Sequence, residues 1–400
     1  MANIETLTNL DRTVRRKFKK VFEKLSDAYF VRESILEEAK IAPIIIEGPC
    51  NSWLFLGSHS VQPTFNALRK HIDFNQALIS MGFHEIKYLA IVEQAPSLFD
   101  QENDLPNFVE TIELNEFIDS GADVVNRYLI EVSIMQYNWI KKTLFSESVI
   151  HSQCTTRRKA TNRDNSSSLQ EFFLDYDQEQ ATKFDMFESS SDEELEDNFS
   201  VRLINGVAGS GKTLILINRA ILFCKKYPEK NALLIIHNKP VTSDVTYRIE
   251  KWLGGKPKNL TIQTFHAFAL GQRNRLSNRI KPLFNVKDLK LHKEKILTDD
   301  NDSYKNLNLS DEQIWTEIEY INDYLIESEN DYLEYERHGR GFALQKPQRS
   351  DVWGLYQLTV EAMSLSTGYL PSLYIREMCL MKDTSGLKKF DHVLIDEAQF

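Results

Sequence analysis

The chain has 400 residues, of which 42% are hydrophobic and 26% charged, and its formal net charge is −10 at pH 7. These values are ordinary for a soluble globular protein and leave room for two or three domains. The four cysteines form no CxxC pair, which argues against a zinc site or a disulfide framework and fits a reducing compartment. No stretch approaches the roughly 18 apolar residues of a membrane helix, so we expect a cytoplasmic protein that does not contact a membrane.

Residues 1–150 are predicted to form one α+β domain. Residues 10–25 place apolar side chains on one helical face and Arg and Lys on the other. The basic face is either an arm for nucleic acid or the solvated face of a core helix, and charge runs are usually the second. Two apolar strands around a Gly-Pro turn are predicted within residues 41–58, a further strand at 86–93, and helices from there to about residue 147.

Two polar segments follow this domain. Residues 151–170 lack apolar periodicity and are predicted to be a flexible linker. Residues 188–197 hold six acidic and no basic residues and are predicted to be a disordered surface loop. Residues 273–295, in contrast, hold eight Lys or Arg and two acidic residues. A chain of net negative charge therefore still offers a basic track that can bind a phosphate backbone.

From residue 201 on, strands alternate with helices, which predicts an α/β fold with a parallel sheet. The strands are predicted at 201–205, 232–236, 260–265 and again within 391–400. The intervening residues 286–385 are mostly helical, and Ser310 with Gln313 forms a capping-box start for one of these helices. We therefore expect one α/β domain made of residues 171–285 and 386–400, interrupted by a helical insertion.

A glycine loop follows the first of these strands. The sequence GVAGSGKT matches GxxxxGK[ST] through Gly206, Gly211, Lys212 and Thr213. Glycines let backbone N–H groups turn inward around phosphate oxygens, and the following helix adds its positive end. Lys212 would reach the β- and γ-phosphates and Thr213 would bind Mg²⁺. The predicted phosphate cradle consists of Gly206, Val207, Ala208, Gly209, Ser210, Gly211, Lys212 and Thr213. The alternative is a glycine turn without a ligand.

A second motif, HVLIDEAQF, lies about 180 residues further on. It is an apolar strand that ends in Asp396 and Glu397. Asp396 would hold Mg²⁺ through water, and Glu397 would take a proton from the attacking water. Many strands end in acidic residues, so the pair alone is weak evidence, but joined to the glycine loop it predicts a site for ATP and Mg²⁺.

In this order, GVAGSGKT, TIQTFHAFA and VLIDEAQF resemble the motifs of UvrD/Rep-like superfamily 1 helicases. The resemblance implies a P-loop, RecA-like sheet. It also implies that Asp396, Glu397 and Gln399 form a DE-x-Q motif, in which Gln399 couples the state of the γ-phosphate to the bound strand. The family's second RecA-like domain would supply an arginine finger, so we expect this chain to be the front part of a longer helicase.

Other segments extend the resemblance. LDYDQEQA (174–181) looks like the adenine-reading Q motif with Gln178 as its glutamine, although Gln178 could equally be an exposed helix residue. LLIIHNKPVTSDV (233–245) is similar to the next motif, with Asn238 and Lys239, but His237 stands where the family often has Thr or Ser. TFHAFA resembles the single-strand motif and makes Thr264, Phe265 and His266 candidates for nucleic-acid contact.

The helical insertion at 286–385 is similar to the accessory 1B subdomain of these helicases. It contains Arg337, Arg340 and Arg349, which are either contacts to nucleic acid or solvated surface arginines.

Some members also carry an N-terminal nuclease-related domain. A metal nuclease needs a D/E-x-K pattern and a further acidic residue. HEIK offers Glu85 and Lys87, with Asp73 or Glu47 as partners, but such patterns are common by chance. We therefore interpret residues 1–150 as a degenerate nuclease-related domain, or as a module that binds a nuclease or other protein subunit.

Together these features predict an ATP-dependent helicase that moves along single-stranded DNA, for which the resemblance favours 3′ to 5′ polarity. Two alternatives remain. The first is another P-loop enzyme, such as a small-molecule kinase, which would leave TFHAFA unexplained. The second is a non-catalytic ATP-binding scaffold or regulator in a multi-subunit DNA repair or phage-defence complex.

Overall fold

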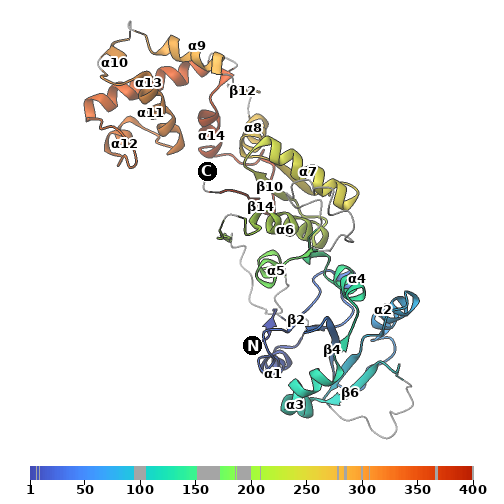
Figure 1. The fold of residues 1–400 in the computed structure, drawn as a ribbon. Coiled ribbons are helices and arrows are strands. Elements are labelled where there is room, and N and C mark those ends of the chain that lie inside the picture. Colours follow the sequence, from blue (N-terminus) through green and yellow to red (C-terminus); the bar gives the residue numbers. More distant parts are fainter. Residues whose placement is uncertain are drawn as a thin grey trace, which may run out of the picture. The chain divides into compact units, whose positions relative to one another are not determined.

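A computed structural model of the chain describes residues 1–5, 7–8, 10–93, 105–150, 172–184, 186, 200–207, 209–276, 279–282, 286–298, 301–305, 307–364 and 368–398. The predicted linker, the predicted acidic loop, Ala208 and Gln399 lie outside these residues. The chain forms two compact units (Figure 1). The first comprises residues 1–234, 243–261 and 392–398, and the second comprises 235–242, 262–391 and 399–400.

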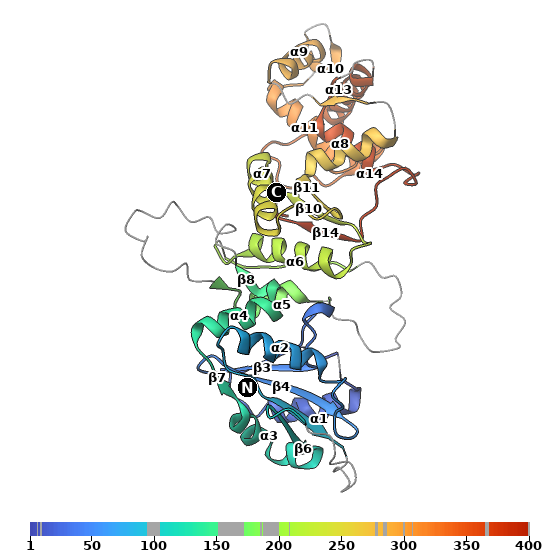
Figure 2. The same cartoon turned by 90° about the vertical axis from the view of Figure 1, so that its right-hand side faces the viewer.

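The N-terminal part of the first unit is a mixed sheet covered by helices on both faces. Its elements are β1 (Asn3–Ile4), α1 (Arg12–Phe22), β2 (Phe30–Arg32), η1 (Glu37–Ala39), β3 (Ile44–Gly48), β4 (Ser52–His59), α2 (Arg69–Ser80), β5 (Tyr88–Val92), β6 (Val109–Glu113), α3 (Leu114–Tyr128), β7 (Ile130–Glu131), α4 (Ile134–Leu144), η2 (Ser146–Ser148) and β8 (Val149–Ile150). The strand order is β1-β2-β3-β4-β5-β6, with β7 on β4. Helices α1 and α3 lie on one face and α2 and α4 on the other (Figure 2).

This two-sided cover explains the apolar run in β3. Ile44 and Ile46 face the core under α1 and α3, while Ile45 faces the core under α2 and α4. Because both faces are buried, the strand is apolar throughout instead of alternating. The antiparallel hairpin of β3 and β4 predicted within residues 41–58 is confirmed. Its turn places Cys50 and Asn51 in the left-handed region, with φ of 57° and 58°.

Two features of this domain bear on the sequence predictions. The apolar face of α1 is buried through Val14, Phe18, Val21 and Phe22, so its basic residues form the solvated side of a core helix. We predicted only helices between residue 93 and about 147, and this was wrong for β6 and for the short strand β7. The β6 sequence VETIE does not alternate, because Val109 and Ile112 are three residues apart and are buried in the cores on opposite faces of the sheet. Strand β6 pairs with β5 in parallel, and burial of these two residues favours the strand.

The first unit also contains β9 (Phe172–Phe173), α5 (Tyr176–Lys183), α6 (Lys212–Lys226) and β14 (His392–Ile395). Three further elements contain residues of both units: β10 (Ala232–Ile236), α7 (Lys239–Leu253) and β11 (Leu260–Thr264). Three of the strands form a sheet in the order β11-β10-β14. The strand predicted at 201–205 is not formed: no described strand pairs with it, and Val201 and Leu203 are 71% and 75% exposed. Apolar residues alone do not make a strand without a ladder partner.

The rest of the second unit is mostly helical. It contains α8 (Phe265–Leu276), β12 (Lys281–Pro282), α9 (Val286–Ile296), α10 (Asp302–Lys305), α11 (Asp311–Asp323), α12 (Glu329–Glu334), α13 (Lys346–Ser364), β13 (Gly368–Tyr369) and α14 (Pro371–Cys379). The predicted capping box of Ser310 and Gln313 is confirmed at the start of α11. Trp315, Tyr332 and Tyr374 are among the large side chains of the core.

A buried carboxylate organises this helical unit. Glu317 on α11 accepts hydrogen bonds from the Tyr332 hydroxyl at 2.8 Å, from Arg337 Nε at 2.5 Å and from Arg340 Nε at 3.0 Å. Burial would raise the pKa of Glu317, but the hydrogen bonds from Arg337 and Tyr332 and the arginine charges lower it. Arg349 donates to three backbone carbonyls at the end of α12. The three arginines considered for nucleic-acid contact therefore bind within the unit itself.

A buried histidine lies in the core under α2. The ring of His71 has no solvent exposure, and Asn75 Nδ2 lies 3.1 Å from its Nε2. Phe55, Tyr88 and Phe108 surround it, with ring centroids 4.9 to 5.2 Å away. Burial lowers the pKa of His71 from 6.5 to about 3. The imidazole is therefore neutral in the folded protein at neutral and mildly acidic pH.

We expect this histidine to make folding pH-dependent. Below pH 6.5 the unfolded chain binds a proton at His71 and the folded chain does not until about pH 3. Stability should therefore fall with decreasing pH in that window, by about 1.4 kcal/mol per pH unit from this residue. His71→Gln should flatten the profile, measured as urea unfolding at a series of pH values beside the wild type. An unchanged slope would contradict the assignment.

Glu317→Ala should destabilise the helical unit. The substitution leaves two largely buried guanidinium groups and a buried hydroxyl without their acceptor, which costs about 3–5 kcal/mol. Glu312→Ala, at an exposed position on the same helix, is the matched control and should change the free energy of unfolding by less than about 1 kcal/mol. Chemical denaturation followed by circular dichroism distinguishes the two. Equal effects of both substitutions would argue against the buried cluster as the cause.

Candidate nucleotide site

The glycine loop has a geometry that only glycine permits at several positions. Gly209 and Gly211 have φ of 83° and 84°, in the left-handed region that side chains avoid. A Cβ on Gly206 would lie 2.6 Å from Ser210 Oγ. Helix α6 begins directly after this loop, at Lys212. The backbone therefore curves closely around the start of a helix, which is the geometry that binds phosphate.

Lys212 lies across the loop that precedes it. Its Nζ donates to the carbonyls of Gly206 at 2.8 Å and Val207 at 3.1 Å. Both acceptors are neutral backbone oxygens, and a phosphate oxygen is a stronger partner for an ammonium group. The ammonium group can therefore exchange its carbonyl partners for a phosphate at the mouth of the loop.

A hydrogen bond joins the two motifs. Thr213 Oγ1 donates to Asp396 Oδ2 at 2.9 Å, although 183 residues separate the two in sequence. The bond brings the first turn of α6 to the end of β14, so a hydroxyl and a carboxylate oxygen lie side by side. Mg²⁺ takes oxygen ligands and keeps several waters, so one or two such protein ligands with phosphates suffice. The donor set fits Mg²⁺.

Glu397 follows in an unusual backbone conformation. Its φ is 55°, and its side chain is exposed. A non-glycine residue in this region costs free energy and occurs often at functional sites. Strand β14 ends at Ile395, so Asp396 and Glu397 directly follow the strand.

Gln178 contacts the glycine loop. Its Nε2 donates to the Ser210 carbonyl at 3.1 Å, and a Cβ on Gly211 would lie 3.1 Å from the same atom. Its Oε1 accepts from the backbone N–H of Asp175 at 3.1 Å, and this completes a capping box at the start of α5. The sequence left open whether Gln178 belongs to the site or is an exposed helix residue. In the structure it is half-buried and touches the loop.

The sequence analysis missed Arg219, which connects three parts of the site. From α6 it donates to the carbonyls of Thr182 at 3.1 Å and Phe184 at 2.6 Å, at the end of α5. Its Nε donates to His392 Nε2 at 3.2 Å, at the start of β14. Burial, and then Arg219, lower the pKa of His392 to about 4, so this ring stays a neutral acceptor. The only sequence signal is a cation in the middle of a largely apolar helix.

The candidates for nucleic-acid contact near α7 are polar and exposed. Asn238 Oδ1 accepts from the backbone N–H of Val241 at 2.9 Å and so caps α7. Lys239, the first residue of that helix, is exposed. His237 is exposed as well.

The TFHAFA candidates differ among themselves. Thr264 is buried, and its hydroxyl accepts from the backbone N–H of Ala267 at 3.3 Å, which caps α8. Phe265 is 43% exposed. His266 Nδ1 lies 3.4 Å from the Tyr374 hydroxyl, and burial lowers the pKa of this histidine. Phe265 thus offers an accessible ring, whereas the other two side chains have structural partners.

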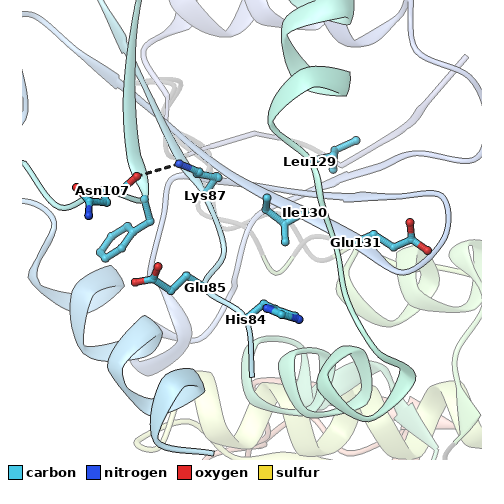
Figure 3. A pocket seen from close by; sticks show the side chains of 8 residues that line it. His84, Glu85, Lys87, Asn107, Leu129, Ile130 and Glu131 are labelled. Atoms are coloured by element: carbon cyan, nitrogen blue, oxygen red, sulfur yellow. Dashed lines mark hydrogen bonds between the residues drawn. The ribbon is translucent and has the colours of Figure 1, made fainter. Parts of the chain in front are cut away.

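A shallow pocket of about 460 Å³ on the N-terminal domain includes both residues of the D/E-x-K pattern (Figure 3). Its lining residues are His84, Glu85, Lys87, Asn107, Phe108, Leu129, Ile130 and Glu131. Lys87 donates to the Asn107 carbonyl and pairs with Glu110, each at 2.9 Å. Glu47 instead pairs with Arg32 and Lys141, and Asp73 lies on α2. In the part of the chain that the structure describes, no group of three His, Cys, Asp or Glu side chains is placed to hold a metal ion.

Comparison with known proteins identifies the family. A family model described as the UvrD/REP helicase N-terminal domain matches residues 188–399, more than half of the 400. No curated protein matches the chain, and none of the described helices has the length and apolar character needed to cross a membrane. The match includes the glycine loop, TFHAFA and the Asp396–Glu397 pair, but neither residues 1–150 nor Gln178. The α/β, RecA-like fold class predicted from the sequence is confirmed. The chain belongs to the UvrD/REP helicase family.

Proposed function

We propose that this protein binds ATP with Mg²⁺ at the glycine loop and uses ATP hydrolysis to move along single-stranded DNA. The observation that carries the proposal is the hydrogen bond from Thr213 to Asp396. It brings together the two oxygen ligands that a P-loop motor needs, from motifs far apart in sequence. A glycine turn that binds no ligand would not need a carboxylate beside Thr213.

Each part of the site has a task in this proposal. Backbone N–H groups of residues 206–213 and the start of α6 bind the phosphates, and Lys212 contacts the β- and γ-phosphates. Thr213 and Asp396 would hold Mg²⁺, the latter through water, and the bound ion neutralises charge on the phosphates. Glu397 orients the attacking water and accepts its proton. Gln399 would couple the γ-phosphate to the strand.

Nucleotide selectivity and strand binding are assigned to other residues. Gln178 would read the adenine base, since it reaches the loop from α5. Phe265 would stack on a base, because its ring is exposed and stacking is tolerant of sequence. Asn238, Lys239, Thr264 and His266 would lie along the same strand. The single-stranded DNA is thus bound by side chains of the second unit.

The domain assignment is also part of the proposal. Residues 171–285 and 386–400 form the RecA-like domain, and residues 286–385 form its helical 1B insertion. Residues 151–170 connect this domain to residues 1–150, which act as a module for a nuclease or other protein subunit. The helical content between α9 and α14 supports the insertion.

Lys212→Ala should weaken ATP binding at least about tenfold, because a charge-assisted contact to phosphate is lost. Lys225→Ala, an exposed lysine at the other end of α6, is the matched control and should bind as the wild type does. Calorimetric titration with ATP and Mg²⁺ gives the affinity, and phosphate release with and without single-stranded DNA gives the turnover. Unchanged binding by Lys212→Ala would refute the site. Binding without turnover, also in a form that carries a second RecA-like domain, would favour the scaffold.

Asp396→Asn should separate metal binding from phosphate binding. The asparagine keeps an oxygen for the Thr213 hydroxyl but loses the charge that favours Mg²⁺. We expect ATP affinity in the presence of Mg²⁺ to fall roughly tenfold, with little change in its absence. Asp383→Asn, an exposed carboxylate, serves as the control. Equal losses with and without Mg²⁺ would contradict a metal role for Asp396.

A further inference from the structure

Helix α5, which carries Gln178, is held by the N-terminal domain on one side and by α6 on the other (Figure 2). The preceding strand β9 pairs with β8, and the backbone N–H of Leu174 donates to the Ser148 carbonyl at 2.8 Å. The ring of Tyr176 lies on Phe30 of β2, with centroids 5.7 Å apart. An isolated helix of eight residues is unstable in water, so these contacts fix its position.

A further contact of α5 is ionic and buried. Glu179 is 1% exposed and lies 2.6 Å from Nη1 of Arg32, on β2. Nη2 of Arg32 in turn lies 2.9 Å from Glu47 of β3. One guanidinium group thus joins two strands of the N-terminal sheet to α5.

A second cation repeats this arrangement one turn later. Lys183 Nζ lies 2.6 Å from Glu179, 2.9 Å from Glu5 and 3.2 Å from Glu147. Its side chain is 2% exposed. Glu5 follows β1 and Glu147 belongs to η2. The last residue of α5 is therefore bound to both ends of the N-terminal domain in sequence.

Arg32, Glu179 and Lys183 are charged at neutral pH, whereas burial raises the pKa of Glu5. Burial would raise the pKa of Glu179, but Arg32, Lys183 and Lys141 outweigh it and lower that pKa to about 2. Burial would lower the pKa of Lys183, but its three carboxylate partners raise it. A buried ion pair adds little to the free energy of unfolding, but removal of one partner destabilises the protein strongly because it leaves a buried charge unpaired. Their consequence here is geometric, because α5 cannot shift without leaving a buried charge unpaired.

The ionic cluster that fixes Glu179 also fixes the residue of α5 that contacts the glycine loop. Consecutive helical residues point about 100° apart, so neighbours on α5 face different surroundings. Glu179 enters the ionic cluster, while Gln178 reaches the Ser210 carbonyl in the glycine loop. A movement of Glu179 relative to the N-terminal sheet that α6 does not follow therefore moves Gln178 relative to the loop.

We propose that the N-terminal domain sets the nucleotide preference of the site: Arg32 and Lys183 position α5 so that Gln178 meets an adenine base. This inference rests on the proposed nucleotide site. Arg32 and Lys183 are positioning residues, since they act through Gln178. The domain thereby acquires a role that requires neither a nuclease site nor a partner.

The test compares nucleotides that differ only in the base. Dissociation constants for ATP, GTP and inorganic tripolyphosphate are measured by calorimetry on the full chain. Gln178→Ala and Arg32→Met should each lower the preference for ATP over GTP about five- to tenfold, as expected for one or two hydrogen bonds. Tripolyphosphate affinity should not change, because it has no base. The double variant should lose no more than either single one, and Arg32→Lys should recover part of the preference.

Two further variants keep the test decisive. Phe30→Ala removes the contact to Tyr176 without leaving a buried charge, so it should lower the preference even if Arg32→Met fails to fold. Phe117→Leu, in the core between α1 and α3, should leave the preference unchanged although it destabilises the domain. Retained preference in Arg32→Met and Phe30→Ala, or in Gln178→Ala, would overturn the inference, as would a wild type without preference. A failure of the proposed function would give other results. In that case the wild type would not bind ATP, or Lys212→Ala would bind ATP as tightly as the wild type.

Discussion

The hydrogen bond between Thr213 and Asp396 is the contact on which the candidate site depends. It closes a loop of 183 residues, and it places a hydroxyl and a carboxylate where a metal bound to phosphate needs oxygen ligands. Neither motif is a complete site alone, since the glycine loop lacks a carboxylate and β14 lacks a phosphate cradle. Membership of the UvrD/REP helicase family agrees with this pairing.

The surroundings of the site are held by buried charges. Arg219 ties the end of α5 to α6 and to the start of β14. Arg32 and Lys183 tie α5 to the N-terminal sheet. In the helical unit Glu317 plays the corresponding part for two arginines. Since removal of one partner leaves an unpaired buried charge, each cluster allows one arrangement of its elements and resists others.

Several sequence predictions depended on context that sequence does not contain. Residues 201–205 have no described strand beside them and form none, whereas VETIE has β5 beside it and becomes β6. Arg337, Arg340 and Arg349 were plausible contacts for nucleic acid until their partners within the helical unit were known. Arg219 had no motif to mark it. In each case the partner lies on another element, and local patterns do not identify it.

The sequence by itself determined the local chemistry. Spacing of glycines, Lys212 and Thr213 defines a phosphate loop because backbone curvature and helix polarity are local properties. It also determined the hairpin of β3 and β4 and the capping box at Ser310, which involve neighbours within a few residues. Only the tertiary structure decided that Thr213 meets Asp396, that Gln178 reaches the glycine loop, and that Glu179 is buried against Arg32. The two residues of each contact are between 32 and 183 positions apart in sequence. Such contacts depend on packing between elements and not on the order of residues within one element.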